Sequence, residues 1–167
     1  MRLCFGLQIA AMLGSLSGAA PLAAGQGFVA IVHPSNPVVN LSTAALRAIF
    51  SGMVTRWPNQ TKIVLAQRSG GSAANQFLMD RLLRTSWQDY KRSLQALEFM
   101  GQEPAVVRVL NTPEAACKFV FNVPSAVSLI EASAVSTPEC RDVKVLKVDG
   151  YLPGQDGYKL KEGYQLK

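Results

Sequence analysis

The chain has 167 residues, a length that suits one domain. Its formal net charge is +6, with Lys and Arg scattered along the chain except for a loose C-terminal group in KLKEGYQLK. The sequence lacks the stripe of basic residues with interleaved aromatics that marks a nucleic-acid surface, so no nucleic-acid partner is expected. A moderately basic chain instead fits an anionic ligand or an acidic partner surface.

Residues 1–24 are predicted to be a secretory signal peptide. Arg2 supplies a basic start, FGLQIAAMLGSLSGAA (5–20) is weakly apolar, and PLAAG provides a small-residue cleavage end. The apolar stretch is short and diluted by Gly and Ser, whereas a membrane span needs about 20 apolar residues. We therefore expect cleavage after Ala24, a periplasmic or secreted location, and a mature domain over residues 25–167.

Two cysteines remain after this segment. Cys117 and Cys140 would meet an oxidising compartment, which favours a disulfide, whereas Cys4 leaves with the signal. Two separate buried thiols stay open as the alternative, because sequence cannot place the Cα atoms. The sequence has no Cys/His cluster with metal-ligand spacing, and the single His33 cannot anchor a metal site. Neither a metal nor a cofactor is expected.

Strands and helices alternate from residue 28 onward. FVAIV (28–32) is a continuous apolar run typical of a buried strand, and KIVLA (62–66) is a second. Between them Ser42 is placed to cap a helix over STAALRAIFSGM, whose apolar residues recur at helical spacing. A further helix is expected over residues 72–83.

The second half continues the alternation. TSWQDYKRSLQALEFM predicts a helix capped at Thr85 or Ser86, and Thr112 followed by Pro113 begins another. Three further strands are expected: AVVRVL (105–110), AVSLI (126–130) and VKVLKV (143–148). Residues 148–167 are rich in Gly and Tyr and are expected to be an irregular tail along the surface. The pattern predicts an α/β sheet with helices on its faces.

The loop in VLAQRSGGSAANQF (64–77) is a candidate anion site. First-turn N–H groups of a helix lack intrahelical partners and carry partial positive charge. Gly70 and Gly71 leave the backbone open to a ligand, Ser69 and Ser72 offer hydroxyl donors, and Arg68 offers a charge-assisted contact. On the local string alone, an ordinary N-cap at Ser72 and an ordinary turn at the glycines are the favoured alternative, because Ser is a common N-cap without any ligand.

An enzyme is not expected from this sequence. Ser69 or Ser72 as a nucleophile would need a base, and His33 is the only histidine in the chain. The Gly-x-Ser-x-Gly motif of a nucleophile elbow is absent. The acidic residues are scattered on helix faces and turns, which gives paired-carboxylate chemistry no support.

The segment VAIVHPSNPVVNLSTAALRAIFSGMVTRWPNQTKIVLAQRSGGSAANQFLMDRLL resembles the phosphate-binding protein family of phosphate ABC importers. LRAIFSGMVTRW is its most specific element, and NTPEAACKFVFNVPSAVSLI continues the likeness, which covers about residues 28–152. The resemblance implies a single-lobe periplasmic-binding-protein-like domain with a mostly parallel sheet flanked by helices. Members of that family have two lobes with the ligand between them, and this chain resembles one lobe.

The resemblance also implies site residues. The family loop reads roughly Arg-x-Asp-Gly-Ser-Gly-Thr, onto which Arg68, Gly71 and Ser72 map by match. Gly70 stands at the aspartate position and Ala74 at the threonine position, so one acidic acceptor and one hydroxyl are missing. Ser69 joins the predicted set on its local chemistry alone.

The function expected from these observations is an exported solute-binding-like protein that holds a small oxyanion, phosphate above all, in phosphate uptake or sensing. Its expected partners are an ABC permease or another exported protein. The alternative is a non-transporting interaction or regulatory module that kept the lobe but lost tight phosphate binding. A lone lobe would leave exposed the face that a second lobe covers, and that face could join two copies into a homodimer.

Overall fold

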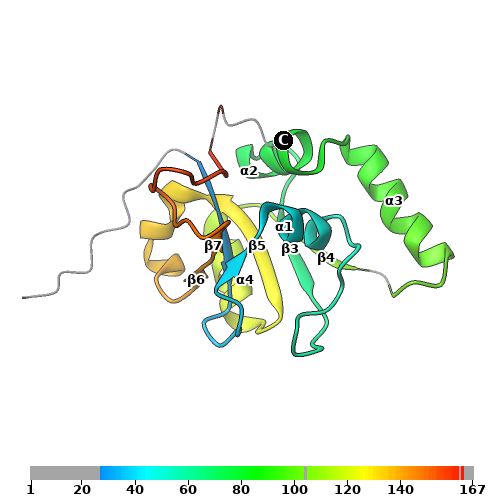
Figure 1. The fold of residues 1–167 in the computed structure, drawn as a ribbon, viewed down its shortest axis with the longest axis horizontal. Coiled ribbons are helices and arrows are strands. Elements are labelled where there is room, and N and C mark those ends of the chain that lie inside the picture. The colour runs from blue at the N-terminus through cyan, green and yellow to red at the C-terminus, as the bar shows by residue number, and fades with distance from the viewer. Residues whose placement is uncertain (1–26, 104, 162, 164–167) are drawn as a thin grey trace, which may run out of the picture.

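A five-stranded sheet forms the centre of the molecule in the computed structural model, which describes residues 27–103, 105–161 and 163 (Figure 1). The strands are β1 (Phe28–Val32), β2 (Asn40–Leu41), β3 (Val64–Arg68), β4 (Val106–Leu110), β5 (Ala126–Glu131), β6 (Lys144–Val145) and β7 (Lys147–Val148). The helices are α1 (Thr43–Phe50), α2 (Ala73–Phe77), α3 (Trp87–Phe99) and α4 (Pro113–Asn122). A π-helical segment (Leu78–Leu83) directly continues α2, and two 3₁₀ turns (Ala132–Ser136 and Pro138–Cys140) follow β5. The predicted signal peptide, residues 1–24, lies outside the described residues.

The strand order is β4-β3-β5-β1-β6, and the sheet is mostly parallel. β3 runs parallel to both β4 and β5, whereas β1 is antiparallel to its neighbours β5 and β6. Four of the five strands therefore share one direction, with β1 as the exception. The α/β fold class with a mostly parallel, helix-flanked sheet is confirmed.

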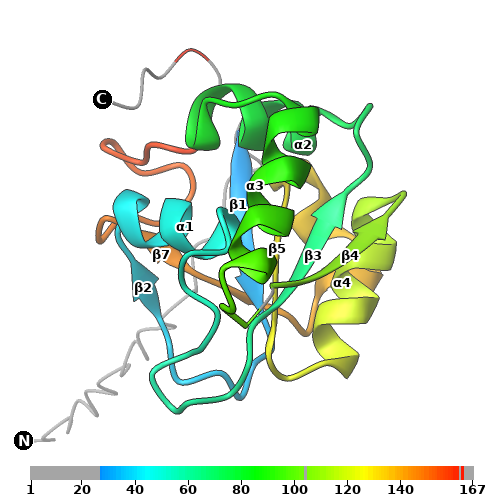
Figure 2. The ribbon, with the colours of Figure 1, turned by 90° about the vertical axis from the view of Figure 1, so that its right-hand side faces the viewer.

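Both faces of the sheet are covered. Figure 2 shows α1 and α4 on opposite sides of it, and the two apolar clusters divide in the same way. Along β1, Phe28 and Ala30 face the cluster with α1, while Val29 and Ile31 face the cluster with α4. A strand buried on both faces needs apolar residues at every position, which explains the unbroken run FVAIV.

Local capping sets the helix starts. The Ser42 hydroxyl accepts a hydrogen bond from the Ala45 N–H at 3.0 Å, and Thr112 accepts one from the Ala115 N–H at 3.1 Å. Ser86 rather than Thr85 caps α3, because its hydroxyl accepts from the Asp89 N–H at 3.1 Å. Each helix begins within a residue of its predicted start.

The C-terminal part departs from the expectation in two ways. The single strand expected over residues 143–148 is wrong: β6 pairs with β1, but β7 pairs with β2 in a separate two-stranded sheet. The segment after β7 is irregular, yet Tyr158 and Leu160 are buried rather than on the surface. The Tyr158 hydroxyl donates to the Phe28 carbonyl at 2.9 Å, and the Phe28 N–H donates to the Leu160 carbonyl at 2.7 Å. These bonds tie the segment to β1.

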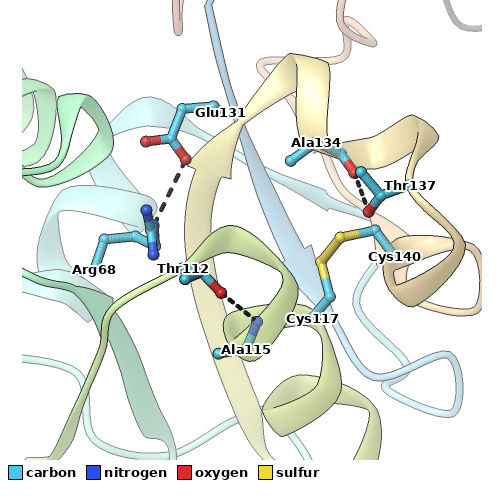
Figure 3. The surroundings of a disulfide bond; sticks show 8 residues. All are labelled: Arg68, Thr112, Ala115, Cys117, Glu131, Ala134, Thr137 and Cys140. Atoms are coloured by element: carbon cyan, nitrogen blue, oxygen red, sulfur yellow. Dashed lines mark hydrogen bonds and ion pairs between the residues drawn. A yellow bond between two sulfur atoms is a disulfide. The ribbon is translucent and has the colours of Figure 1, made fainter.

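A disulfide joins Cys117 of α4 to Cys140 in the 3₁₀ turn Pro138–Cys140 (Figure 3). Both cysteines are buried within the apolar cluster on the α4 face of the sheet. The bond therefore holds the segment after β5 against α4, the helix that precedes β5. Among the described residues, no helix is both long and apolar enough to cross a bilayer.

Tyr90 anchors α3 to the body through a buried hydrogen-bond pair. Its hydroxyl donates to the Phe50 carbonyl at 2.8 Å and accepts from Gln67 Nε2 at 2.5 Å. Burial raises the pKa of the Tyr90 phenol to about 12, although the Gln67 donor opposes part of that rise. Because the folded pKa lies above the unfolded value near 10, the resulting stability is complete below pH 10 and is lost as the pH rises towards 12.

Tyr90→Phe tests this contact. The variant leaves the Gln67 donor and the Phe50 carbonyl without this partner, so it should lose about 1–3 kcal/mol of unfolding free energy at neutral pH. From pH 10 to 11 the wild type should lose more stability than the variant, on the order of 1 kcal/mol. Urea unfolding at pH 8, 10 and 11 measures both effects. Burial also raises the pKa of Tyr158, but Tyr158 is present in both proteins and contributes equally to their losses. Equal losses in the wild type and the variant would therefore contradict a raised pKa at Tyr90.

Candidate functional site

The candidate site lies where β3 and β5 end. These strands are parallel neighbours, with Ala66 of β3 opposite Ser128 of β5, so their carboxyl ends meet at the same edge of the sheet. β3 ends in Arg68 and continues into the loop of residues 69–72, while β5 ends in Glu131. Ligands of open α/β sheets bind at this edge, outside the carboxyl ends of the strands.

Arg68 is held in the protein interior beneath the loop. Only 6% of its surface is exposed. Its Nη1 donates to the Leu110 carbonyl at the end of β4, at 3.4 Å, and its Nε lies 3.6 Å from Oε2 of Glu131 (Figure 3). Among the described residues, Nε has no hydrogen-bond acceptor. A buried guanidinium with an unused donor can bind an oxyanion without moving far.

The two serines of the loop serve different purposes. The Ser69 N–H donates to the Leu110 carbonyl at 3.0 Å, which extends the pairing of β3 with β4 by one residue. Ser72 caps α2: its hydroxyl accepts from the Asn75 N–H at 3.2 Å and donates to the Ser69 carbonyl at 2.8 Å. Because the Ser72 hydroxyl proton is engaged within the loop, this side chain would have to rotate before it could donate to a ligand.

Gly70 and Gly71 form the exposed top of the loop. A Cβ built on either residue meets no atom within 4 Å, and neither residue has a positive φ. Their backbone conformation therefore does not require glycine. What the two glycines provide is an exposed backbone with open space around it.

Glu131 is the residue that the sequence analysis missed. Its Oε1 accepts from the Ala74 N–H in the first turn of α2 at 3.3 Å, and its Oε2 faces Arg68. The signal that could have found it is its position, directly after the predicted strand 126–130. Because β3 and β5 are parallel neighbours, the residues at their carboxyl ends come together, as Arg68 and Glu131 do here.

His33 lies at the opposite edge of the sheet from Arg68 and Glu131. It follows β1, which runs antiparallel to β5, with Phe28 opposite Glu131 and Val32 opposite Val127. The carboxyl end of β1 is therefore at the opposite edge of the sheet from Arg68. The His33 ring bonds the Ser35 hydroxyl at 2.7 Å instead, as part of its own loop. Within the described residues, no group of three or more His, Cys, Asp or Glu is arranged to hold a metal.

A family model described as the PBP superfamily domain matches residues 19–155. The chain belongs to this family. The match takes in every element from β1 to β7 and therefore the whole Arg68 site. Together with the solved structures described next, it confirms the family resemblance drawn from the sequence.

Solved structures share this fold at low sequence identity. An ABC-type phosphate transport receptor from Vibrio cholerae is 19% identical, with a TM-score of 0.61 over 82% of this chain and 55% of its own. PstS from Borrelia burgdorferi is 15% identical, with a TM-score of 0.61 over 76% of this chain and 49% of its own. A phosphate binding protein from Stenotrophomonas maltophilia is 18% identical, with a TM-score of 0.56 over 77% of this chain and 40% of its own.

The chain thus spans 40–55% of the length of these structures. At such identities the likeness establishes the fold, which is the fold of part of each of these proteins. A search of curated proteins found no match to the chain.

Proposed function

We propose that this chain is an exported solute-binding-like protein that holds a small oxyanion, phosphate above all, at Arg68 and the loop of residues 69–72. Its role would lie in phosphate uptake or sensing, without catalysis. An ABC permease or another exported protein would be its partner, and no nucleic acid would be involved. The expected ligand contacts are the Arg68 guanidinium, the Ser69 hydroxyl, the Gly71 backbone, and the Ser72 hydroxyl once it has rotated.

The observation that carries this proposal is the burial of Arg68. A guanidinium that is 6% exposed costs free energy to desolvate, and at this site its Nε makes no hydrogen bond within the described residues. The adjoining loop leaves open space above Gly70 and Gly71. A tetrahedral oxyanion that reached Nε from this loop would supply the acceptor that Nε lacks, and backbone N–H groups of the loop would add contacts.

Family and covalent structure add support. The solved structures named above are a phosphate transport receptor, PstS and a phosphate binding protein, and each shares the fold of this chain. The disulfide between Cys117 and Cys140 is consistent with an oxidising compartment and hence with export through the predicted signal peptide.

Ligand-linked stabilisation tests the proposal. With constant ionic strength set by chloride, 10 mM phosphate should raise the melting temperature of the wild type by a few degrees. A dissociation constant of about 1 mM would correspond to about 1.4 kcal/mol of stabilisation. Arg68→Ala should show no phosphate-dependent shift relative to its own baseline, because the buried cation is gone.

Arg56→Ala is the matched control for this experiment. Arg56 pairs with Glu103 on the surface, with 47% of its side chain exposed, and lies outside the candidate site. Its phosphate-dependent shift should equal that of the wild type. If 10 mM phosphate stabilises the wild type no more than Arg68→Ala, the proposed binding site is wrong.

An interaction module is the second candidate, and exposed apolar residues at the end of α3 favour it. Phe99 is 90% exposed and Met100 66% exposed, and Figure 1 shows α3 at the edge of the fold. Exposed aromatic and Met side chains are characteristic of protein interfaces. Sedimentation with and without phosphate separates the candidates, since dimers that form regardless of phosphate would favour an interaction module.

A further inference from the structure

The carboxylate of Glu131 contacts two of the donors that the candidate site would offer to an oxyanion. Its Oε1 accepts from the Ala74 N–H at 3.3 Å, and its Oε2 lies 3.6 Å from Nε of Arg68. Figure 3 shows the two side chains pointing toward each other across the gap between the ends of β3 and β5. A first-turn N–H of a helix and a buried guanidinium are both donors that favour an anion.

We infer that Glu131 is a built-in competitor that fills the oxyanion site and must be displaced before phosphate or sulfate binds. This inference rests on the proposed function and specifies how that same site is regulated. With Glu131 in place, the positive charge of Arg68 is already compensated, and an incoming dianion meets a like charge at short range. The affinity of the wild-type site for an oxyanion is therefore low as long as Glu131 stays in place.

The contacts of Glu131 are those of a group that can be displaced. The distance of 3.6 Å to Arg68 exceeds that of a normal hydrogen bond, and Oε2 has no hydrogen-bond partner among the described residues. The Glu131 side chain is 24% exposed, so rotation about its χ angles can bring the carboxylate into water. Arg68 stays behind in this exchange, because it is buried and its Nη1 donates to the Leu110 carbonyl.

Competition and direct ligand contact by Glu131 predict different effects on oxyanion selectivity. A competitor that withholds donors lowers the affinity for every tetrahedral oxyanion, whether or not it carries a proton. A carboxylate that accepted a hydrogen bond from bound phosphate would instead favour protonated phosphate over sulfate. The observed geometry supports competition, since both Glu131 oxygens face the donors that a ligand needs.

Calorimetric titration of Glu131→Gln with inorganic phosphate and with sulfate tests the inference. The amide keeps an oxygen for the Ala74 N–H but removes the charge, so both affinities should rise at least about tenfold, which corresponds to about 1.4 kcal/mol. Glu103→Gln is the matched control: it removes the same charge from the exposed pairs with Arg56 and Lys62 and should leave both affinities unchanged.

The other outcomes overturn the inference in distinguishable ways. If the wild type binds phosphate and Glu131→Gln binds it no more tightly, Glu131 is not a competitor and the proposed function survives. If Glu131→Gln binds phosphate less tightly with sulfate unchanged, Glu131 is a ligand-accepting group instead. If neither protein binds phosphate or sulfate, both the proposed function and the competitor role are wrong.

A second measurement needs no substitution and so does not depend on the variant folding. In ¹³C-labelled wild type, the side-chain carboxyl resonance of Glu131 should move towards the position of a solvated glutamate as phosphate is added. A carboxyl resonance that stays fixed while other signals report phosphate binding would overturn the displacement.

Discussion

Replacing both Cys117 and Cys140 with alanine is expected to lower the free energy of unfolding by about 3 kcal/mol. The two residues are 23 positions apart, and a cross-link that closes a loop of this size restricts the unfolded chain by about that amount in the chain-entropy model. Both side chains are also buried in the apolar cluster around α4, where the lost sulfur atoms leave unfilled space. The disulfide is thus expected to contribute a large share of the stability of this small fold.

Guanidinium unfolding of the oxidised wild type, the reduced wild type and the double variant measures this contribution. Dithiothreitol should lower the midpoint of the wild type but leave the double variant unchanged, which separates loss of the bond from other effects of the reductant. A difference below about 1 kcal/mol between oxidised wild type and double variant would contradict the expected role.

The second large effect is expected at Arg68, where alanine should cost about 2–4 kcal/mol of stability. Truncating Arg68 leaves the partly buried Glu131 carboxylate without its cation and removes the bond to the Leu110 carbonyl. Breaking a buried ion pair from one side leaves an uncompensated charge, whereas removing both partners does not. Arg68→Ala with Glu131→Ala should therefore cost less than the sum of the two single substitutions.

A double-mutant cycle by guanidinium unfolding gives this coupling directly. We expect at least about 1 kcal/mol between Arg68 and Glu131, and a clearly smaller coupling for the exposed pair of Arg56 and Glu103 measured in the same way. Additive losses at Arg68 and Glu131 would mean that the two side chains do not interact as the structure places them. The cycle requires no ligand and so tests the geometry of the site separately from its function.

Much of the fold follows from local features of the sequence. Ser42, Ser86 and Thr112 cap their helices because the side-chain bond to the backbone N–H spans only a few residues. The run FVAIV marks a strand covered on both faces, which is also a local pattern. The expectations that depended on such short-range chemistry were the accurate ones.

The errors arose where pairing joins distant segments. The division of residues 143–148 between two sheets depends on partners far along the chain, which periodicity does not reveal. The burial of Tyr158 likewise depends on its bond to Phe28, 130 residues away.

The candidate site shows the same division between local and distant information. Arg68 and the loop of residues 69–72 were visible as one continuous string with a family resemblance. Glu131 was not, because only the parallel pairing of β3 with β5 brings it to Arg68. The sequence resemblance placed Gly70 at an aspartate position, whereas the carboxylate that lies next to Arg68 in the structure comes from β5.

The measurement that tests the account most directly is a map of backbone amide resonances during phosphate titration of ¹⁵N-labelled protein. A phosphate site at Arg68 predicts shifts concentrated in residues 69–74 and at Glu131, with no such shifts in Arg68→Ala. Shifts that cluster elsewhere, or that persist in Arg68→Ala, would contradict a phosphate site at Arg68.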